Sequence, residues 1–327
     1  MKWMRFLTGN FCFLFFATGV FANNLPMKDT IPINNSATFV KQNNFFSLDS
    51  TLGKAFEKTV SPPSISFYSL FNPHKIFYRV TSISSLTDLN ILEQNISYKT
   101  QADITTQYAV NDTLNNECTF NVSITKLKAQ METMGIQLRY NSQDSTQDTT
   151  SAFAKPLLGI ADKNIRLSVD TNGVIKAIDT SSMGEKVMAA LSRLSISGND
   201  FQVNNNFGLM LSHNNDSLSL GESWSDSIAF PNGSKRIITY TVQSLLNNEI
   251  VLIITGSIIQ KGDIQSDGHK FTTDFSGTQL GKIVAAKNTR LVKSRSVTYT
   301  LKGSVQVEGK DYPASAVSKI NEIITSE

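Results

Sequence analysis

Residues 296–308, which read Ser-Val-Thr-Tyr-Thr-Leu-Lys-Gly-Ser-Val-Gln-Val-Glu, decide the fold of this chain. The odd-numbered positions from Val297 to Val307 carry apolar side chains and one glycine, whereas every even-numbered position is polar. A period of two residues indicates a β-strand that buries one face and exposes the other. The strand is also long, because strands typically run to about five or six residues.

The same alternation recurs over residues 94–110 and 119–126, and short polar turns separate the runs. Asn111-Asp112 lies between two of them, and residues 170–173 (Asp-Thr-Asn-Gly) contain the Asn-Gly pair that favours a tight hairpin turn. Strands joined by such short turns pair antiparallel. The sequence therefore predicts a long antiparallel sheet whose apolar face has to be covered.

One helix is expected at the centre of the chain, over Met183–Leu194. Its apolar side chains recur at helical spacing, and Ser181 or Ser182 is placed to cap it ahead of Glu185. A fainter helical pattern over residues 314–324 predicts a second, C-terminal helix. The expected fold class is accordingly mainly β: a long curled antiparallel sheet, as a half-barrel or as two sheets, with one central helix.

Residues 1–22 have the pattern of a cleaved export signal. Lys2 and Arg5 give a positive start, an apolar run covers residues 11–16, and Ala22 ends a small-x-small cleavage pattern. The apolar run is shorter than the roughly 20 residues that a membrane-spanning helix needs. We therefore expect export, cleavage after Ala22, and a mature protein that is periplasmic or secreted.

Beyond this leader, the composition divides the chain into an arm and a domain. Residues 23–73 are rich in Asn, Ser and Lys and contain the Pro62-Pro63 pair, so a polar, partly disordered arm is expected. Residues 74–327 are expected to form the β-rich domain, either as one unit or as two halves joined by a helical segment over residues 181–215.

Charge and cysteine content limit the partners. The formal net charge of +3 includes Lys2 and Arg5, so the chain after the leader is close to neutral, which argues against nucleic acid as a partner. No later run is long and apolar enough for an integral membrane helix. Cys118 is the only cysteine left after cleavage, so no internal disulfide can form, and a buried, inert thiol is expected.

No grouping of residues supports catalysis, a cofactor or a bound metal. His74, His213 and His269 are far apart, and the acids around residues 263–274 lack the spacing of a calcium-binding loop. Residues 221–225 (Gly-Glu-Ser-Trp-Ser) lack the last glycine of a nucleophile elbow. We therefore expect a protein that is not an enzyme and has no catalytic, cofactor-binding or metal-binding residues.

Three features in sequence carry a resemblance to a known family. A strand-Asp-x-x-Gly-strand unit over residues 167–178, a following helix, and a Gly-Glu-Ser-Trp stretch over residues 221–224 resemble an uncharacterised family of exported bacterial proteins. The likeness covers roughly residues 77–301 and implies no known activity. In architecture, the curled sheet and helix also resemble the lipoprotein-carrier fold, which implies an apolar concavity that holds acyl chains.

Two interpretations of function stay open. In the first, the protein binds an apolar ligand such as a lipid between the sheet and the central helix. The side chains expected to line that cavity are Val187, Met188, Leu191, Leu194 and Met210. In the second, the protein is a structural or partner-binding module of the cell envelope, which binds another envelope protein through its surface.

Asp followed by Ser or Thr recurs along the chain and is similar to the O-glycosylation sequence of some Gram-negative bacteria. Thr30, Thr113 and Ser217 are the candidate acceptors. Turn chemistry and the abundance of these residue types explain the same pattern, so both interpretations are kept.

Overall fold

The computed structural model of the protein describes residues 59–60, 70–91, 94–114, 117–146, 154, 157–158, 164–179, 203–211, 217–229, 233–266, 269–307 and 309–327. The elements that these residues form are all β-strands. Their bounds are β1 (Thr59–Val60), β2 (Ile76–Ile91), β3 (Gln94–Leu114), β4 (Glu117–Thr133), β5 (Ile136–Asn141), β6 (Asn164–Asp170), β7 (Ile175–Asp179), β8 (Leu218–Ser219), β9 (Ser223–Ala229), β10 (Lys235–Ser244), β11 (Glu249–Ser266), β12 (His269–Ala286), β13 (Val292–Val307) and β14 (Lys310–Ser326).

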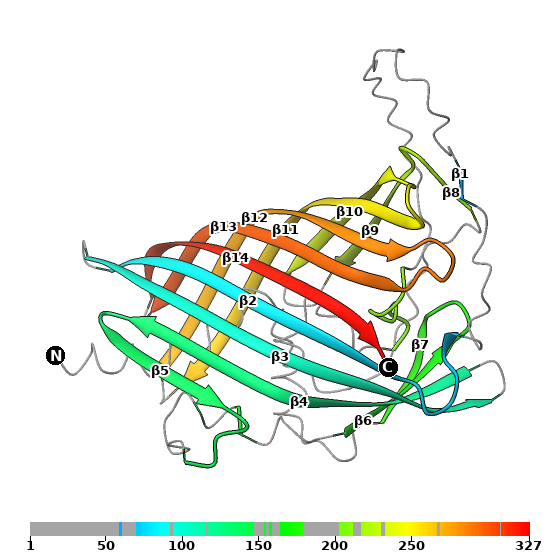
Figure 1. Cartoon of the computed structure of the whole chain (residues 1–327). Helices are drawn as coiled ribbons and strands as arrows, with labels where there is room; N and C mark the ends of the chain where they lie inside the picture. Colours follow the sequence, from blue (N-terminus) through cyan, green and yellow to red (C-terminus); the bar gives the residue numbers. More distant parts are fainter. Residues whose placement is uncertain are drawn as a thin grey trace.

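One 12-stranded antiparallel sheet makes up most of the described chain (Figure 1). Its strand order is β7-β6-β4-β3-β2-β14-β13-β12-β11-β10-β9, and β5 pairs with the C-terminal half of β4. The end strands β7 and β9 do not pair with each other in this order, so the sheet is open. β1 and β8 form a separate two-stranded sheet. The expected class, mainly β and antiparallel, is confirmed.

The period of two residues predicted for residues 296–308 is present in β13. Val297, Tyr299 and Leu301 are each 1% exposed. Thr300 and Lys302, which alternate with them, face solvent. We call the face that carries the buried side chains the inner face and the opposite one the outer face. The hydrophobic core lies along the inner face, as the alternation requires.

The C-terminal helix expected over residues 314–324 is wrong. This segment belongs to β14, which pairs with β13 on one side and with β2 on the other. Buried Ala316, Ser318 and Ile320 alternate with solvent-facing residues, among them Val317, which is 47% exposed. Because Ala and Ser are only weakly apolar, the alternation is faint and the larger apolar residues imitate helical spacing. Pairing on both sides then fixes the extended backbone.

Several predicted features lie outside the described residues. They are the export signal with its cleavage after Ala22, the central helix over Met183–Leu194, and most of the arm over residues 23–73. Of the segment over residues 181–215, the structure describes residues 203–211, which form turns and isolated bridges. None of the described segments forms a helix of the length and apolarity needed to cross a membrane.

The hairpin turn predicted over residues 170–173 is confirmed. Gly173 has a φ of 77° and donates its N–H to the Asp170 carbonyl oxygen at 2.9 Å. The Asp170 carboxylate also accepts the N–H of Val174 at 2.8 Å. Glycine suits this turn because the left-handed backbone region carries no steric penalty for it.

The turn predicted at Asn111-Asp112 is wrong. Strand β3 continues through both residues, and its pairing with β4 changes register between Val110 and Asp112. This arrangement is a β-bulge, which takes up an extra residue without reversing the chain. Polar residues such as Asn and Asp suit both features, so the sequence alone does not separate them.

Close approach of neighbouring strands bends the middle of the sheet. A Cβ atom on Gly277 of β12 would lie 1.9 Å from the Thr300 carbonyl oxygen. A Cβ atom on Gly303 of β13 would likewise lie 1.9 Å from the Asp274 carbonyl oxygen. Any larger residue would push a neighbouring strand away, so these glycines permit the tight coiling of the sheet.

Residues 203–211, which we call the strap, join two distant parts of the sheet. Isolated bridges link Asn206 to Val174, just before β7, and Met210 to Leu291, just before β13. Six steps between neighbouring strands separate β7 from β13, which is about 29 Å along a flat sheet. The four residue steps from Asn206 to Met210 span at most about 14 Å, and each bridge adds about 5 Å. The sheet must therefore curl to bring both strands within reach of the strap.

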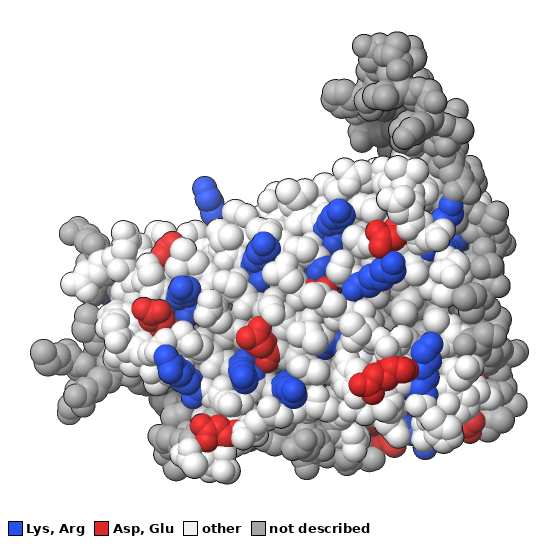
Figure 2. Space-filling model, viewed as in Figure 1, with Lys and Arg blue, Asp and Glu red and all other residues white. Residues whose placement is uncertain are grey.

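The surface carries charges of both signs. Figure 2 shows Lys and Arg interspersed with Asp and Glu on the side of the molecule seen in Figure 1. Some charges pair across strands: Lys261 Nζ lies 3.1 Å from Asp274 Oδ2, and Lys293 Nζ lies 2.9 Å from Glu249 Oε1. Exposed pairs of this kind contribute about 0–1 kcal/mol each. Interspersed charges produce no strong field of one sign on this side.

Candidate functional site

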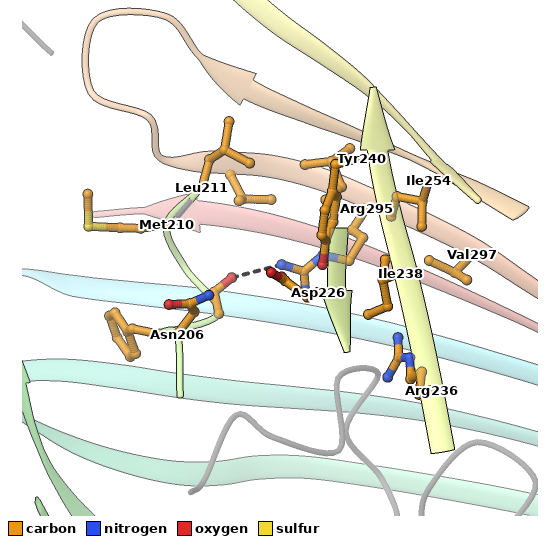
Figure 3. A pocket seen from close by; sticks show the side chains of 14 residues that line it. Asn206, Met210, Leu211, Asp226, Arg236, Ile238, Tyr240, Ile254, Arg295 and Val297 are labelled. Carbon is orange, nitrogen blue, oxygen red and sulfur yellow. Dashed lines mark hydrogen bonds between the residues drawn. The ribbon is translucent and has the colours of Figure 1, made fainter. Parts of the chain in front are cut away.

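A partly open pocket of about 100 Å³ lies between the strap and the inner face of β9–β13 (Figure 3). From the strap, its lining includes Asn206, Phe207, Gly208, Met210 and Leu211. From the sheet, its lining includes Asp226, Arg236, Ile238, Tyr240, Ile254, Ile283, Val292, Arg295 and Val297. The walls are therefore mainly apolar, but charged side chains from three different strands reach them.

The alternation of inner and outer side chains along β10, together with its pairing with β9, places polar side chains at the pocket. Arg236, Ile238 and Tyr240 share the inner face, and the pairing of β9 with β10 sets Asp226 opposite Ile238. Asp226 is thus a diagonal neighbour of Arg236 and of Tyr240, with Cα separations of about 7–8 Å. Trp224 lies opposite Tyr240, and the two rings stack with centroids 5.3 Å apart and planes 22° apart.

Two glycines allow close strand contacts beside the pocket. Gly256 of β11 lies opposite Ile238, and Gly281 of β12 lies between Ile254 of β11 and Val297 of β13. A Cβ atom on Gly281 would lie 2.5 Å from a carbonyl oxygen of β13. Backbone and side-chain atoms of the neighbouring strands already occupy the space that a Cβ atom would take at either position, so the strands approach closely beside the pocket.

Arg236 contacts neutral hydrogen-bonding groups of the sheet. Its Nε donates to Gln279 Oε1 at 3.2 Å, and its Nη2 donates to the Tyr299 hydroxyl at 3.2 Å. The guanidinium also lies 5.8 Å from the centroid of the Tyr299 ring, whose face attracts cations. Gln279 is 2% exposed, and its Nε2 donor has no hydrogen-bond partner among the described residues.

Arg295 ties the strap to the sheet. Its Nη1 donates to Glu322 Oε2 at 3.1 Å, and its Nη2 donates to the Gly208 carbonyl oxygen at 3.3 Å (Figure 3). Glu322 is 1% exposed, and its Oε1 lies 3.9 Å from Arg79 Nε and accepts the Thr81 hydroxyl at 3.4 Å. Two guanidinium groups therefore share one buried carboxylate. Removing one partner of such a pair is strongly destabilising, because a buried charge loses its counter-charge.

Burial changes the proton affinity of two pocket groups. It raises the pKa of the Asp226 carboxyl above its ordinary value. Burial, and then the negative charge of Asp226, raises the pKa of Tyr240 to about 12, while Arg236 and Arg295 act in the opposite direction. The Tyr240 hydroxyl is thus within electrostatic reach of all three charged groups. Both Asp226 and Tyr240 hold their protons more tightly than usual.

An aromatic cluster fills the inner face along β2–β4. Phe71, Phe77 and Phe120 are each 0% exposed. The strap adds Phe207, whose ring centroid lies 4.6 Å from that of Phe120 and 5.8 Å from that of Tyr108. Tilted and edge contacts at these distances stabilise aromatic pairs beyond the burial of their area. The strap is therefore anchored in a filled core on one side and borders the pocket on the other.

Met210 is the only described member of the set predicted to line a ligand cavity, and it lines this pocket from the strap. Val187, Met188, Leu191 and Leu194 lie outside the described residues. The pocket is therefore built against the strap, which the predictions had included only as part of a helical segment.

The candidate modification sites differ in exposure. Thr113 is half-buried near the end of β3, and its N–H donates to Asp112 Oδ1 at 2.7 Å. Ser217 is exposed immediately before β8. Thr30 lies outside the described residues. Accessibility therefore favours Ser217 over Thr113 as an acceptor.

Cys118 is fully buried, and its Sγ lies 3.8 Å from the Phe71 carbonyl oxygen. Burial, and then the charge of Asp112, raises the pKa of Cys118 to about 12. The thiolate, which is the reactive form, is therefore strongly disfavoured. Within the described part of the chain, no three His, Cys, Asp or Glu side chains come together as a metal site would require.

Asp226, Arg236 and Arg295 are pocket residues that the predictions missed. A signal was present, since each is a charge on the inner face of an alternating strand; Arg236, for example, precedes Ile238 and Tyr240 at a spacing of two. This sequence signal is incomplete, because the register of the strands decides which of these charges line the same pocket. The register depends on pairing between strands and cannot be inferred from the sequence of one strand.

Solved structures offer only distant likenesses. A chain of the structure titled "Lipid-protein interactions in lipovitellin" is 14% identical with a TM-score of 0.44, over 79% of this chain and 26% of that chain. Our chain thus spans about a quarter of the lipovitellin chain. OccK7 (OpdD) of Pseudomonas aeruginosa is 7% identical with a TM-score of 0.22, over 78% of this chain and 100% of that chain. Neither likeness transfers a function.

None of the curated proteins is detectably similar to the chain in sequence. The family described as "Family of unknown function (DUF6263)", however, matches residues 115–292, which is more than half of the chain. The match includes the strap and most of the pocket, whereas Arg295 and Val297 follow its end. The resemblance to an uncharacterised family is thereby confirmed, and the chain belongs to the family of unknown function DUF6263.

Proposed function

We propose that this protein is a non-catalytic binding protein that holds an apolar or amphipathic ligand, such as a lipid, between the strap and the sheet. The observation that carries the proposal is the partly open pocket, whose apolar walls come from the strap and from β10–β13. An apolar group that enters it gains roughly 25 cal/mol for each Å² removed from water. Ligand sites are commonly of this kind, concave and apolar with a few placed polar groups.

The pocket volume limits what part of a ligand it holds. About 100 Å³ is available, which is less than the roughly 150 Å³ of an engineered cavity that binds benzene. The pocket therefore accommodates one end of an amphipathic molecule. A longer chain would extend through the open side of the pocket or displace the strap.

Binding rather than catalysis is the proposed work of the site. Tyr240 and Asp226 carry the hydroxyl and carboxyl groups of the pocket, and both have raised pKa values. A tyrosine that acts as a nucleophile or base needs the opposite property, a lowered pKa near the working pH, so the raised pKa of Tyr240 argues against that role. Arg236 and Arg295 cannot act as bases at neutral pH, because a guanidinium does not lose its proton there.

Export through a cleaved leader is part of the proposal. It is supported by the positive start, the short apolar run and the cleavage pattern of residues 1–22. Mass measurement of the protein from a periplasmic or culture fraction is expected to give a chain that starts at Asn23. A chain that retains Met1 in the cell interior would contradict export.

Native mass spectrometry tests the binding function. The protein, expressed with its own leader and purified without detergent, is expected to carry a stoichiometric non-peptide adduct or to bind added 1-octanol. Leu211→Trp, which fills the pocket from the strap, should abolish binding. Leu280→Trp is the matched control, because Leu280 is 62% exposed on the outer face. A bare polypeptide that ignores 1-octanol would favour the partner-binding interpretation instead.

A further inference from the structure

The polar side of the pocket is rich in hydrogen-bond donors. Arg236 from β10 and Arg295 from β13 reach it from different strands, and the hydroxyl of Tyr240 lies within electrostatic reach of both. In Figure 3 the labelled side chains of Arg295, Tyr240 and Asp226 gather on one side of the pocket, opposite Asn206 and Met210. Guanidinium groups only donate, and they match the geometry of carboxylate and phosphate.

We infer that the ligand of this pocket is an amphiphile with an anionic head group (carboxylate, phosphate or sulfonate), which is bound by Arg236 and Arg295 with the Tyr240 hydroxyl. This inference rests on the binding function proposed above and names the chemistry of its ligand. The apolar part of the ligand lies against Ile238, Ile254 and Leu211, which line the same pocket.

The surroundings of Arg295 support an anion at this position. Its carboxylate partner, Glu322, also serves Arg79 and Thr81, so one buried negative charge is divided among several donors. Arg295 is directed to the pocket wall as well as to Glu322 and the strap. An added anion would lower the electrostatic free energy of such an arrangement, and its effect is strong because the site is poorly solvated.

The hydrogen bonds of Arg236 hold its guanidinium at the pocket wall. Gln279, which does not line the pocket itself, accepts from Arg236 Nε through Oε1, and the Tyr299 hydroxyl accepts from Nη2. An anion bound by Arg236 would add a charge-assisted hydrogen bond to these neutral contacts.

Asp226 is the acidic group on the pocket wall, and it does not favour a cationic ligand. Burial disfavours its ionised form, and the same wall carries two guanidinium groups. A quaternary ammonium would therefore meet two guanidinium charges against a single carboxyl group, whose ionised form burial disfavours.

Three probes of equal chain length test the inference: 1-octanesulfonate, 1-octanol and octyltrimethylammonium, each below its micelle concentration. Trp224 reports binding, because it stacks on Tyr240 and the other tryptophan, Trp3, lies within the proposed leader. The sulfonate is expected to bind at least about tenfold more tightly than the alcohol, as charge-assisted hydrogen bonds require. The ammonium probe is expected to bind more weakly than the alcohol.

The outcomes separate the inference from the proposed function. Equal binding of sulfonate and alcohol, or tighter binding of the ammonium probe, would overturn the anionic head group and leave apolar binding standing. No fluorescence change and no adduct with any probe would overturn both. Octanoate and octyl phosphate then distinguish the source of the anion: a preference for the first supports a free fatty acid, and a preference for the second supports a phospholipid-like head group.

Variants assign the effect to named residues. Arg236→Gln is expected to weaken sulfonate binding about tenfold while the affinity for 1-octanol changes less than twofold. Lys302→Gln, on the outer face, is the control and should change neither affinity. Tyr240→Phe keeps the ring beside Trp224 and should weaken only the anionic probes, which keeps the test decisive where Arg236→Gln does not fold. Unchanged selectivity in folded Arg236→Gln and Tyr240→Phe would overturn the assignment.

Discussion

The two halves of the inner face have the same alternation of buried and exposed residues, but one half is a filled core and the other contains a pocket. Along β2–β4, large rings fill the inner positions, and Phe120 and Phe207 approach to 4.6 Å between centroids. Along β9–β13, most of the side chains that line the inner face next to the strap are aliphatic or charged, and a pocket of about 100 Å³ lies between them and the strap. Side-chain volume, and not a change of fold, thus separates the packed core from the candidate site.

The strap belongs to both halves, which makes it the place where they are coupled. Phe207 inserts into the aromatic cluster, whereas Met210 and Leu211 line the pocket. Main-chain hydrogen bonds fix both ends, from Phe207 N to Gly173 O at 2.7 Å and from Leu211 N to Arg290 O at 2.9 Å. A ligand that pushes on the strap therefore works against the packing of the other half.

The largest effect is expected from a substitution in the aromatic cluster along β2–β4. Phe120→Ala should lower the free energy of unfolding by about 3–5 kcal/mol, because it removes a fully buried ring from a cluster that cannot collapse around the hole. Phe120 is 0% exposed and contacts both Phe71 and Phe207. Urea unfolding followed by circular dichroism measures the change, and Leu280→Ala on the outer face should stay within about 0.5 kcal/mol. A loss below about 1 kcal/mol would contradict a packed core here.

A second substitution tests the link between the halves. Glu322→Gln keeps the size of the side chain but leaves Arg79 and Arg295 without their shared negative charge. The expected loss is about 3 kcal/mol of unfolding free energy. Hydrogen exchange of the Leu211 amide should also become faster, because Arg295 no longer holds Gly208 in place. Unchanged hydrogen exchange in the strap would show that the ion pair between Arg295 and Glu322 does not hold the strap in place.

A third substitution tests the strands that border the pocket. Gly281→Ala should cost about 1–3 kcal/mol, because its Cβ atom would meet backbone atoms of β13. It should also weaken binding of 1-octanol about tenfold, because Gly281 lies between Ile254 and Val297, and moving these strands apart displaces two side chains that line the pocket. Gly262→Ala is a suitable control, because there a Cβ atom would meet only the movable Thr273 hydroxyl, at 3.1 Å. Unaltered binding in Gly281→Ala would show that the ligand does not depend on Ile254 and Val297.

Local sequence patterns predicted much of the fold. The alternation in residues 296–308 and the Asn-Gly turn in residues 170–173 both gave the observed structure, because each depends on neighbouring residues only. The segment over residues 314–324 gave the wrong element, since its inner positions include Ala316 and Ser318, which carry little apolar signal. Pairing with β2, more than 200 residues earlier in the chain, decided its conformation.

The candidate site was harder to predict, because it depends on contacts between distant segments. Met210 was placed in a ligand cavity from its residue type, but its position opposite Leu291 follows from a bridge across most of the sheet. Arg236 and Arg295 line the same pocket only because β10–β13 pair in one particular register. A slip of one residue would turn either side chain to the outer face.

The smallest expected effect concerns the charge balance of the pocket. Because burial raises the pKa of Asp226 in the folded state, the unfolded chain ionises first as the pH rises. Asp226 therefore does not lower the free energy of unfolding below its ordinary pKa of about 3.9. Above its folded-state pKa, it lowers that free energy by the full amount. Asp226→Asn should remove that penalty and stabilise the protein at pH 7 by about 1 kcal/mol or less, since the carboxyl is only half-buried.

Urea unfolding at pH 3.5 and pH 7.5 measures this difference, with exposed Asp88→Asn as the control. The gain from Asp226→Asn should be present at the higher pH and absent at the lower one, whereas the control should show no such dependence. A loss of stability at pH 7.5 would mean that ionised Asp226 is stabilised by Arg236 or Arg295, the cations that share its wall with Tyr240. In that case Asp226 already neutralises an arginine of the pocket. The two halves of the inner face would then differ in how fully side chains fill them, but the pocket would have no electrostatic need for an anionic ligand.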